Sequence, residues 1–290
     1  MRQKNQGRSL LQIALATGML LAAPSLHAQR APMDTDLYCA GFFTTRAVES
    51  GLAVKSGEDG GFKYEFIAGD YLYLSRGQNT VVNTGGQYMI LRPSVDINRK
   101  ESFPGQQLMV HGMGTLYSEI GRIEVKVVSG AHATAQVLRS CEPIEPGDIA
   151  IPLNARTAPA YKAQRITSRF AEPSGKATGV IATAKEFARV GGEGSIVYLN
   201  IGSGQGLQPG SYLRIRRPFS TDADAFSVDS REYKNPDGTV QRPMLKSELA
   251  AMPSEVLGEV MVLSTEETSA TGIITYSRVE VIVGDSVELE

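Results

Sequence analysis

An internal repeat constrains this chain more than any other feature of its sequence. Residues 70–93 align with residues 195–218 without a gap, and seven of the 24 columns are identical, where ordinary composition gives roughly one or two by chance. The identical residues are strand hydrophobes, glycines and an Arg-Pro pair, which a shared backbone requires. In the first copy they are Tyr73, Leu74, Gly77, Gly85, Ile90, Arg92 and Pro93, and in the second Tyr198, Leu199, Gly202, Gly210, Ile215, Arg217 and Pro218. The chain is therefore expected to contain two modules of one fold.

A second block extends the repeat. Residues 121–153 align with residues 258–290 at an offset of 137 rather than 125, so the second copy carries twelve more residues between its blocks. A short piece, residues 41–45, also aligns with residues 179–183 at an offset of 138. These alignments predict a first β module at 37–153, a linker at 154–175 and a second β module at 176–290.

The hydrophobic pattern predicts the fold class. In the second copy, runs of β-forming residues fall near 177–183, 195–201, 211–217, 256–264, 269–276 and 286–289. Gln208-Pro209-Gly210-Ser211 between two of these runs predicts a type II turn, because Pro209 presets φ and Gly210 accepts a positive φ. Short antiparallel strands usually close into a barrel or sandwich, since open edges pair with other chains. We therefore expect an all-β protein with two tandem barrel-like or sandwich-like modules.

The first 28 residues have the organisation of a secretory signal peptide. Arg2, Lys4 and Arg8 form a basic start, an apolar stretch spans residues 10–23, and Leu26-His27-Ala28 is a suitable cleavage site. We expect cleavage after Ala28, a periplasmic or secreted protein, and no membrane span afterwards; the alternative is an uncleaved anchor helix. Removal of residues 1–28 leaves 26 Lys and Arg against 31 Asp and Glu, a net charge of −5, which argues against general nucleic-acid binding.

The linker and the two excursions differ from the duplicated blocks. The linker carries Arg156, Lys162, Arg165 and Arg169, which we interpret as a solvated connection; the alternative is contact with an anionic envelope polymer. The excursions are residues 94–119 and residues 219–255. The second begins with the acidic segment Asp222-Ala223-Asp224, and it has a turn predicted at 235–238 and a short helix predicted at 244–252. Loops on a fixed scaffold are the usual place for function to diverge, although both excursions are equally compatible with plain surface loops.

The recurring glycines predict turns rather than a ligand-binding loop. A phosphate-binding loop ends in Gly-Lys-Ser/Thr and continues into a helix, whereas Pro209-Gly210-Ser211 continues into a strand. Asp148 and Asp285 each follow a turn glycine and are expected to cap local amides rather than to act as acid or base. Arg92 and Arg217 are expected to bond within their own modules, or else to offer a repeated contact point. The structural turn residues are Gly77, Gly85, Gly147, Asp148, Gly202, Pro209, Gly210, Gly284 and Asp285.

The two cysteines belong only to the first module. Cys39 aligns with Ala177 and Cys141 with Arg278, so neither has a counterpart in the second copy. In a compartment that permits disulfides, this pattern predicts a structural disulfide between Cys39 and Cys141. It would tie the first strand of the module to a strand near its end.

No pattern in the chain indicates catalysis. The expected mature chain has only His111 and His132, and it contains neither a Gly-x-Ser-x-Gly elbow nor a His-Glu-x-x-His motif. We expect no enzyme activity, no cofactor and no metal site. Residues 64–72 resemble the opening of a LysM peptidoglycan-binding motif, but the repeat places their end inside a strand where LysM has a helix.

The second module resembles the C-terminal domain of the flagellar assembly protein T family, which also occurs behind LysM domains in proteins associated with type IV pilus secretins. The matching residues are Gly202, Gly206, Leu207, Gly210, Leu213, Ile215, Arg217, Leu257, Gly258, Val260, Ala270, Thr271, Gly284, Asp285 and Val287. The resemblance implies a small β-barrel-like fold and a scaffolding role in the periplasm, with no catalytic residues. We therefore expect a non-enzymatic envelope protein that binds a protein partner, such as a pilus secretin or a flagellar ring. The alternatives are a peptidoglycan or cell-wall polysaccharide binding protein and a secreted hydrolase.

Overall fold

A computed structural model describes most of the chain from residue 32 onwards. The described residues are 32–49, 51–60, 62–77, 80–97, 100–160, 162, 168–217 and 252–290, with Tyr233, Lys234, Asp237, Val240 and Gln241. The expected signal peptide, Pro218 and residues 222–224 lie outside them, as do the expected turn at 235–238 except Asp237 and the expected helix at 244–252 except Met252. On either side of that turn, β12 (Tyr233–Lys234) pairs with β13 (Val240–Gln241).

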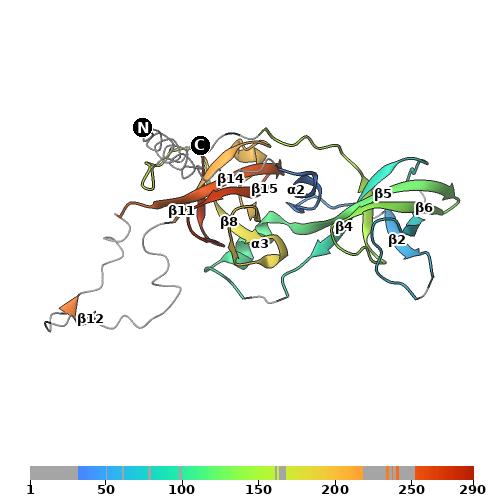
Figure 1. Cartoon of the computed structure of the whole chain (residues 1–290), viewed down its shortest axis with the longest axis horizontal. Helices are drawn as coiled ribbons and strands as arrows, with labels where there is room; N and C mark the ends of the chain where they lie inside the picture. The colour runs from blue at the N-terminus through green and yellow to red at the C-terminus, as the bar shows by residue number, and fades with distance from the viewer. Residues whose placement is uncertain are drawn as a thin grey trace, which may run out of the picture. The chain divides into compact units, whose positions relative to one another are not determined.

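The first module is a closed antiparallel barrel of six strands (Figure 1). The strands follow the order β5-β4-β7-β2-β3-β6, and β6 pairs back onto β5 to close the ring. Their bounds are β2 (Leu52–Gly57), β3 (Tyr71–Arg76), β4 (Gln87–Ser94), β5 (Thr115–Ser129), β6 (His132–Ser140) and β7 (Ile149–Pro152).

The second module is also a closed barrel of six strands, with the order β10-β15-β14-β11-β17-β8. Its strands are β8 (Thr178–Ala184), β10 (Ile196–Leu199), β11 (Tyr212–Arg217), β14 (Glu255–Thr265), β15 (Ala270–Ser277) and β17 (Ser286–Leu289). The connections hold two 3-10 turns, η1 (Lys185–Phe187) and η2 (Ser203–Gln205), and a short pair formed by β9 (Val190–Gly191) and β16 (Val281–Ile282). All six strands expected from the sequence are present, so the predicted fold class is confirmed.

The two barrels share the positions of their β-bulges. The β5–β6 pairing shifts register after Arg122 and after Val125, and the β14–β15 pairing shifts after Glu259 and after Val262. Both positions are related by the offset of 137. A β-bulge changes the bend and twist of a strand, so the same bulges give both barrels the same curvature.

The earliest part of the sequence alignment is wrong. Ala53 pairs with Ile149 as Val180 pairs with Ser286, so the structural counterpart of β8 is β2, at an offset of 127. Residues 42–44 instead form β1 (Phe42–Thr44), which pairs with the start of β5 outside the closed ring. The match of residues 41–45 to residues 179–183 rested on a glycine, two apolar residues and a threonine, which is too little to fix register.

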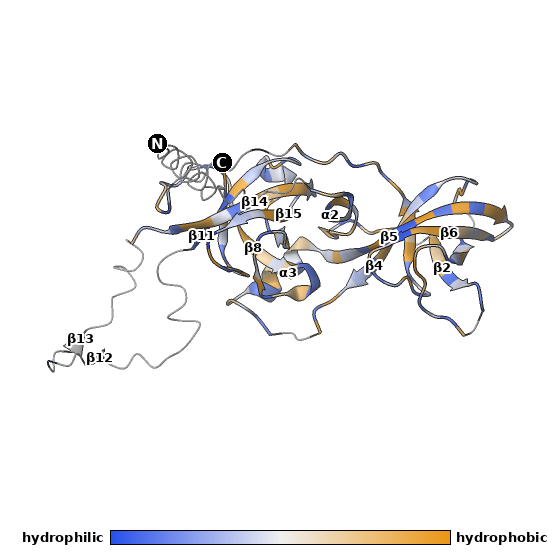
Figure 2. Ribbon diagram, in the orientation of Figure 1, coloured by the Kyte–Doolittle hydropathy of each residue, from blue (hydrophilic) through white to orange (hydrophobic). Residues whose placement is uncertain are grey.

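Each barrel has its own apolar core. Figure 2 shows apolar residues along the strands of both barrels, and the buried ones include Phe66 and Ile123 in the first and Leu213 and Val260 in the second. The glycine at the equivalent position of β5 and β14, Gly121 or Gly258, faces a backbone carbonyl of the next strand, which a Cβ would strike. This close approach explains why that glycine recurs.

A third apolar cluster joins the two barrels. The segment before the first barrel, with α2 (Asp34–Tyr38) and β1, packs on the outer face of β10, β14 and β15. The Tyr198 hydroxyl donates a hydrogen bond to the Ala40 carbonyl at 2.6 Å, and Thr271 Oγ1 donates to the Gly41 carbonyl at 2.9 Å. The Phe43 ring meets the Tyr198 ring edge to face at 5.4 Å between centroids. The barrels therefore share a buried interface.

The predicted disulfide is confirmed, although it holds a different element from the one expected. Cys39 and Cys141 are bonded, with 5.7 Å between their Cα atoms. Cys39 follows α2 and Cys141 follows β6, so the bond fastens the interface segment to the barrel instead of tying the barrel's first strand. Because Cys39 lies before β2, its alignment with Ala177 is also wrong.

The sequence predicted that the cations of the linker are solvated, but two of them, Arg156 and Arg169, form ion pairs. Arg156 Nη2 lies 2.5 Å from Glu119 Oε1, whose side chain is fully buried, and Arg156 Nη1 donates to the Leu37 carbonyl. Arg169 pairs with Glu255 at 2.6 Å. A buried carboxylate requires a partner, so Arg156 is part of the interface. Arg165 lies outside the described residues.

Candidate functional site

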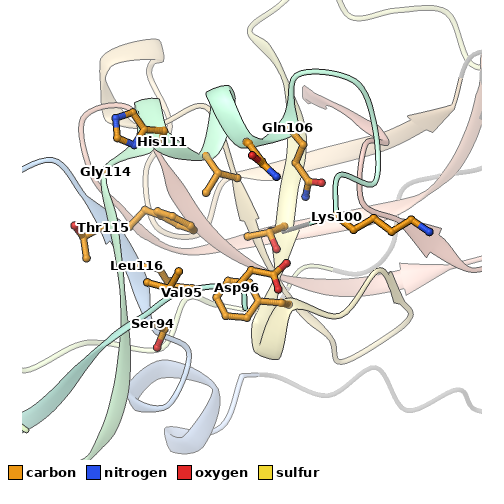
Figure 3. Close-up of a pocket in the computed structure, with 14 residues that line it drawn as sticks. Ser94, Val95, Asp96, Lys100, Gln106, His111, Gly114, Thr115 and Leu116 are labelled. Carbon is orange, nitrogen blue, oxygen red and sulfur yellow. The ribbon is translucent and has the colours of Figure 1, made fainter. Parts of the chain in front are cut away.

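A cavity of about 310 Å³ opens where the two barrels meet. The first barrel contributes the end of β4, the start of β5 and a helix, α3 (Gln106–Met113), and the second contributes β8 and η1. Figure 3 shows Gln106 and Asp96 on opposite sides of the cavity and Lys100 at its edge. The apolar lining residues are Phe43, Val95, Val110, Leu116 and Phe187. An apolar concave site with a few polar groups is the usual form of a binding pocket.

The helix α3 lies in the excursion at 94–119, where the sequence indicated only a divergent loop. It begins after Gly105, at φ 83°, and ends before Gly114, at φ 96°; both positive φ values favour glycine. Gln106 holds the helix in place, because its Oε1 accepts a hydrogen bond from the Ser102 amide and its Nε2 donates to the Ala182 carbonyl of β8. The excursion of the first barrel therefore bridges to the second.

The second barrel's side of the cavity is built on a strained turn. Glu186 and Phe187 have φ of 58° and 55°, a region that bulky residues rarely adopt and that costs of order 1–3 kcal/mol. The turn places Phe187 in the lining. Strained backbone of this kind persists where the surroundings hold it, and it clusters at functional sites.

Three of the described lining residues have side chains that can carry charge: Asp96, Lys100 and His111. Asp96 is the one acidic residue among the described residues that line it, whereas glycoside hydrolysis uses two carboxylates. His111 lies on the exposed side of α3 near the rim, and His132 is exposed on β6 of the first barrel. Over the described ranges, no group of three His, Cys, Asp or Glu side chains is arranged to hold a metal ion. The cavity is suited to receive an apolar group.

The expected turn glycines fall into two kinds. Gly85 and Gly210 have φ of 81° and 87° in equivalent turns, and the Ser211 amide closes the second turn on the Gln208 carbonyl, with Pro209 between them. Gly147 and Gly284 have φ of 99° and 108°. These four positions require glycine because of their positive φ.

Gly77 and Gly202 do not have a positive φ. Gly202 has an ordinary φ of −143°, and a Cβ there would strike the backbone of Glu266 and Ser269. Gly77 donates its amide to the Gly51 carbonyl at 2.7 Å, and its own carbonyl accepts from the Thr80 amide. Close approach of two chain segments, rather than a turn conformation, explains the glycine at position 202.

The recurring arginines and aspartates bind each other. Arg92 Nε lies 2.7 Å from Asp148 Oδ1 and its Nη2 2.8 Å from Oδ2. Arg217 makes the same two contacts with Asp285, at 2.7 and 2.8 Å. The hydrogen bonds that Arg92 donates to the Asp148 carboxylate raise the pKa of Arg92 above its ordinary value. In each barrel, these side chains clamp the turn before the last strand to a strand that pairs with that last strand, β4 or β11.

The aspartates also cap local amides. Asp148 Oδ2 accepts from the Glu145 amide at 2.9 Å, and Asp285 Oδ2 accepts from the Ile282 amide at 2.8 Å. Both carboxylates lie away from the cavity and hold a turn. The arginines also donate to a carbonyl of their own barrels, of Pro143 and of Glu280 respectively.

Neither a scan against protein-family models nor a search of curated proteins gives a match for this chain. Within the described residues, no helix is both long and apolar enough to cross a membrane. The cavity residues Phe43 and Phe187 were not found by sequence reasoning, because no local pattern marks a residue whose partner lies on another barrel. The only signal was the divergence of the excursion at 94–119.

Proposed function

We propose that this protein is a non-enzymatic component of the cell envelope, exported by the signal peptide at residues 1–28, that binds another envelope protein and holds it in an assembly. The observation that carries the proposal is the cavity at the junction of the barrels. Its walls come from both modules, and the disulfide, the Arg156–Glu119 pair and the Tyr198 contacts fix those modules against each other. A site of this kind keeps its shape only while both barrels stay docked.

The arrangement of charge supports a scaffold. The buried carboxylates of Glu119, Asp148 and Asp285 bind arginines of the scaffold, and the duplicated residues are those that hold turns and strands. The resemblance to the flagellar assembly protein T family supports the same class of role. A pilus secretin or a flagellar ring is accordingly the kind of partner we propose.

A second candidate function is binding of peptidoglycan. Aromatic rings on the first barrel favour it, since Phe62 is 94% and Tyr64 66% exposed, and exposed rings stack on sugars. Incubation of the purified chain with isolated sacculi separates the two functions. Retention on sacculi without any protein partner would favour the second.

The test of the proposed function is affinity purification of the mature chain from detergent-solubilised envelopes after chemical crosslinking. Val95 lines the cavity and is 75% exposed, so Val95→Asp places a charge at the apolar site without disturbing a core. We expect wild type to retain a partner and this variant to lose it. Val81→Asp is the matched control, since Val81 is 78% exposed and does not line the cavity. Recovery of the wild-type chain alone, as a monomer, would contradict the proposal.

A further inference from the structure

The outer face of the second barrel shows how this fold binds a peptide segment, which bends at Ala40 and Gly41 before it enters β1. Three neighbouring hydroxyls donate hydrogen bonds to main-chain carbonyls of the segment before the first barrel. Tyr198 on β10 donates to residue 40, Thr271 on β15 to residue 41, and Ser269 just before β15 to residue 43. All three side chains belong to residues that are 2% exposed. The bound segment runs across the barrel, and its Phe43 ring packs on Tyr198.

The first barrel has the same face, which we call the tyrosine face: Tyr71 and Tyr73 on β3, and Thr134 and Gln136 on β6. Tyr73 pairs with Thr134 in the register in which Tyr198 pairs with Thr271. Both hydrogen-bonding residues are therefore identical in the two copies and lie at equivalent places. His132 stands where the second barrel has Ser269, and its ring also offers an N–H donor.

In the first barrel this face is open. Tyr71 is 38% and Tyr73 45% exposed, and the hydroxyls of Tyr73 and Thr134 make no hydrogen bond to any residue that the structure describes. The inward-facing neighbours, such as Leu72 and Ala135, are fully buried, so the strands themselves are formed and rigid. Tyr73 is thus exposed and Thr134 half-buried, at the strand positions whose counterparts bind carbonyls in the other barrel.

The surroundings of the two faces differ in polarity. Met261, Leu263 and Ile273 flank the occupied face, and their counterparts are Glu124, Lys126 and Gln136. Glu124 and Lys126 form an ion pair at 2.5 Å. A permanently buried interface is apolar, whereas an exchangeable one keeps a polar rim. The tyrosine face therefore suits a partner that binds and leaves.

We propose that the tyrosine face binds a segment of a different protein that turns at a glycine as residues 40–41 do, and whose successive main-chain carbonyls accept hydrogen bonds from Tyr73 and Thr134 as residues 40 and 41 accept them from Tyr198 and Thr271. A second copy of this chain does not supply that segment. Its own residues 40–43 are fastened by the disulfide at Cys39 and covered by its own second barrel. The proposal rests on the proposed function, because it names the chemistry of a partner.

The experiment uses the full mature chain and a dye-labelled peptide with the sequence of residues 35–46, in which Cys39 is replaced by serine. Fluorescence anisotropy is expected to show saturable binding to wild type. The double variant Tyr73→Phe/Thr134→Val keeps the shape of the face and removes both hydroxyls, so we expect its affinity to fall about tenfold or more. Tyr64→Phe removes a hydroxyl that is exposed on the same barrel, and it is expected to bind as wild type does.

A second peptide controls for the backbone geometry. Gly41 has φ 75°, and a Cβ there would lie 3.0 Å from the Tyr198 hydroxyl. The peptide carrying Gly41→Val is therefore expected not to bind the tyrosine face.

Three outcomes would overturn this proposal: no saturable binding, equal affinity of the double variant and wild type, or retention on isolated sacculi that Tyr73→Ala abolishes, which would make the face a glycan site. Failure of the peptide while Val95→Asp still loses its crosslinked partner would reject the tyrosine face alone. If the peptide does not bind and Val95→Asp does not lose a crosslinked partner either, the proposed function is rejected as well.

Discussion

Arg217 forms a two-pronged ion pair with Asp285, whose side chain is 2% exposed. The same pair, Arg92 with Asp148, stands at the equivalent place of the first barrel, where Arg92 is 27% exposed. In each pair the arginine lies on the strand that follows the turn at Gly85 or Gly210, which is β4 or β11. The aspartate lies in the turn before the last strand. The duplication has therefore preserved an ion pair as well as a hydrophobic pattern.

The first prediction concerns this pair. Arg217→Leu leaves the Asp285 carboxylate buried without its cation, so we expect the free energy of unfolding to fall by about 3 kcal/mol. Arg92→Leu should cost less, because Arg92 is more exposed. Urea denaturation measures both. Arg46→Leu is the control: its side chain is 78% exposed beside Glu266, and it should change stability by under about 1 kcal/mol. Unchanged midpoints for Arg217→Leu would contradict the structural role of the pair.

The second prediction concerns the disulfide. Cys39 and Cys141 close a loop with a sequence separation of 102 residues, and the chain-entropy estimate for such a loop is about 4–5 kcal/mol. Cys39→Ser/Cys141→Ser should therefore unfold at a much lower urea concentration than wild type. Wild type unfolded in reductant is the matched comparison and should behave as the double variant does. Alkylation of two thiols in protein purified natively, without reduction, would show that the bond is absent.

Much of the fold could be predicted from the sequence because its determinants are local. Tyr212, Leu213 and Ile215 follow a Pro-Gly turn and carry a β pattern. The two long repeated blocks show which residues of the two copies correspond, whereas the short match of residues 41–45 did not. The elements at the junction escaped prediction for a physical reason. β1 and α3 are short, and they are held by partners far along the chain, such as Glu119 with Gly41 and Ala182 with Gln106.

The candidate site was less predictable than the fold. Phe43 packs against Tyr198, which lies 155 residues further along the chain, and Phe187 lines the cavity through an unusual backbone conformation. Neither property has a sequence signature. Arg156, by contrast, was visible as a cation in the linker, but the sequence does not show that Glu119 is buried beside it.

The third prediction concerns the coupling of the barrels. Phe43 is 3% exposed and packs on Tyr198 across the junction, so Phe43→Ala should loosen the second barrel's outer face. Hydrogen exchange followed by mass spectrometry is expected to rise in β10 and β15 and to stay low in β2 and β3. Phe66→Ala is the matched control, because Phe66 is fully buried in the core of the first barrel, and it should raise exchange in β2 and β3 instead. The same exchange pattern for both variants would contradict the assignment of Phe43 to the junction.

The last prediction concerns alkaline pH. Burial, together with the nearby charge of Glu119, raises the pKa of Tyr198 above its ordinary value of 10.0. The unfolded chain ionises this phenol near that ordinary value while the folded chain keeps it neutral. Its contribution to stability is therefore complete below about pH 10 and falls as the pH rises further.

Tyr198→Phe tests this directly. At about pH 8 the variant should lose about 1 kcal/mol, because the buried Ala40 carbonyl loses its donor. Between about pH 10 and about pH 11 it should lose less stability than wild type. Some loss remains, since burial also raises the pKa of Tyr212. Urea midpoints across this range provide the measurement, with exposed Tyr64→Phe expected to follow wild type. Parallel curves for Tyr198→Phe and wild type would show that Tyr198 ionises as freely in the folded chain as in the unfolded one, and hence that the junction is open to water.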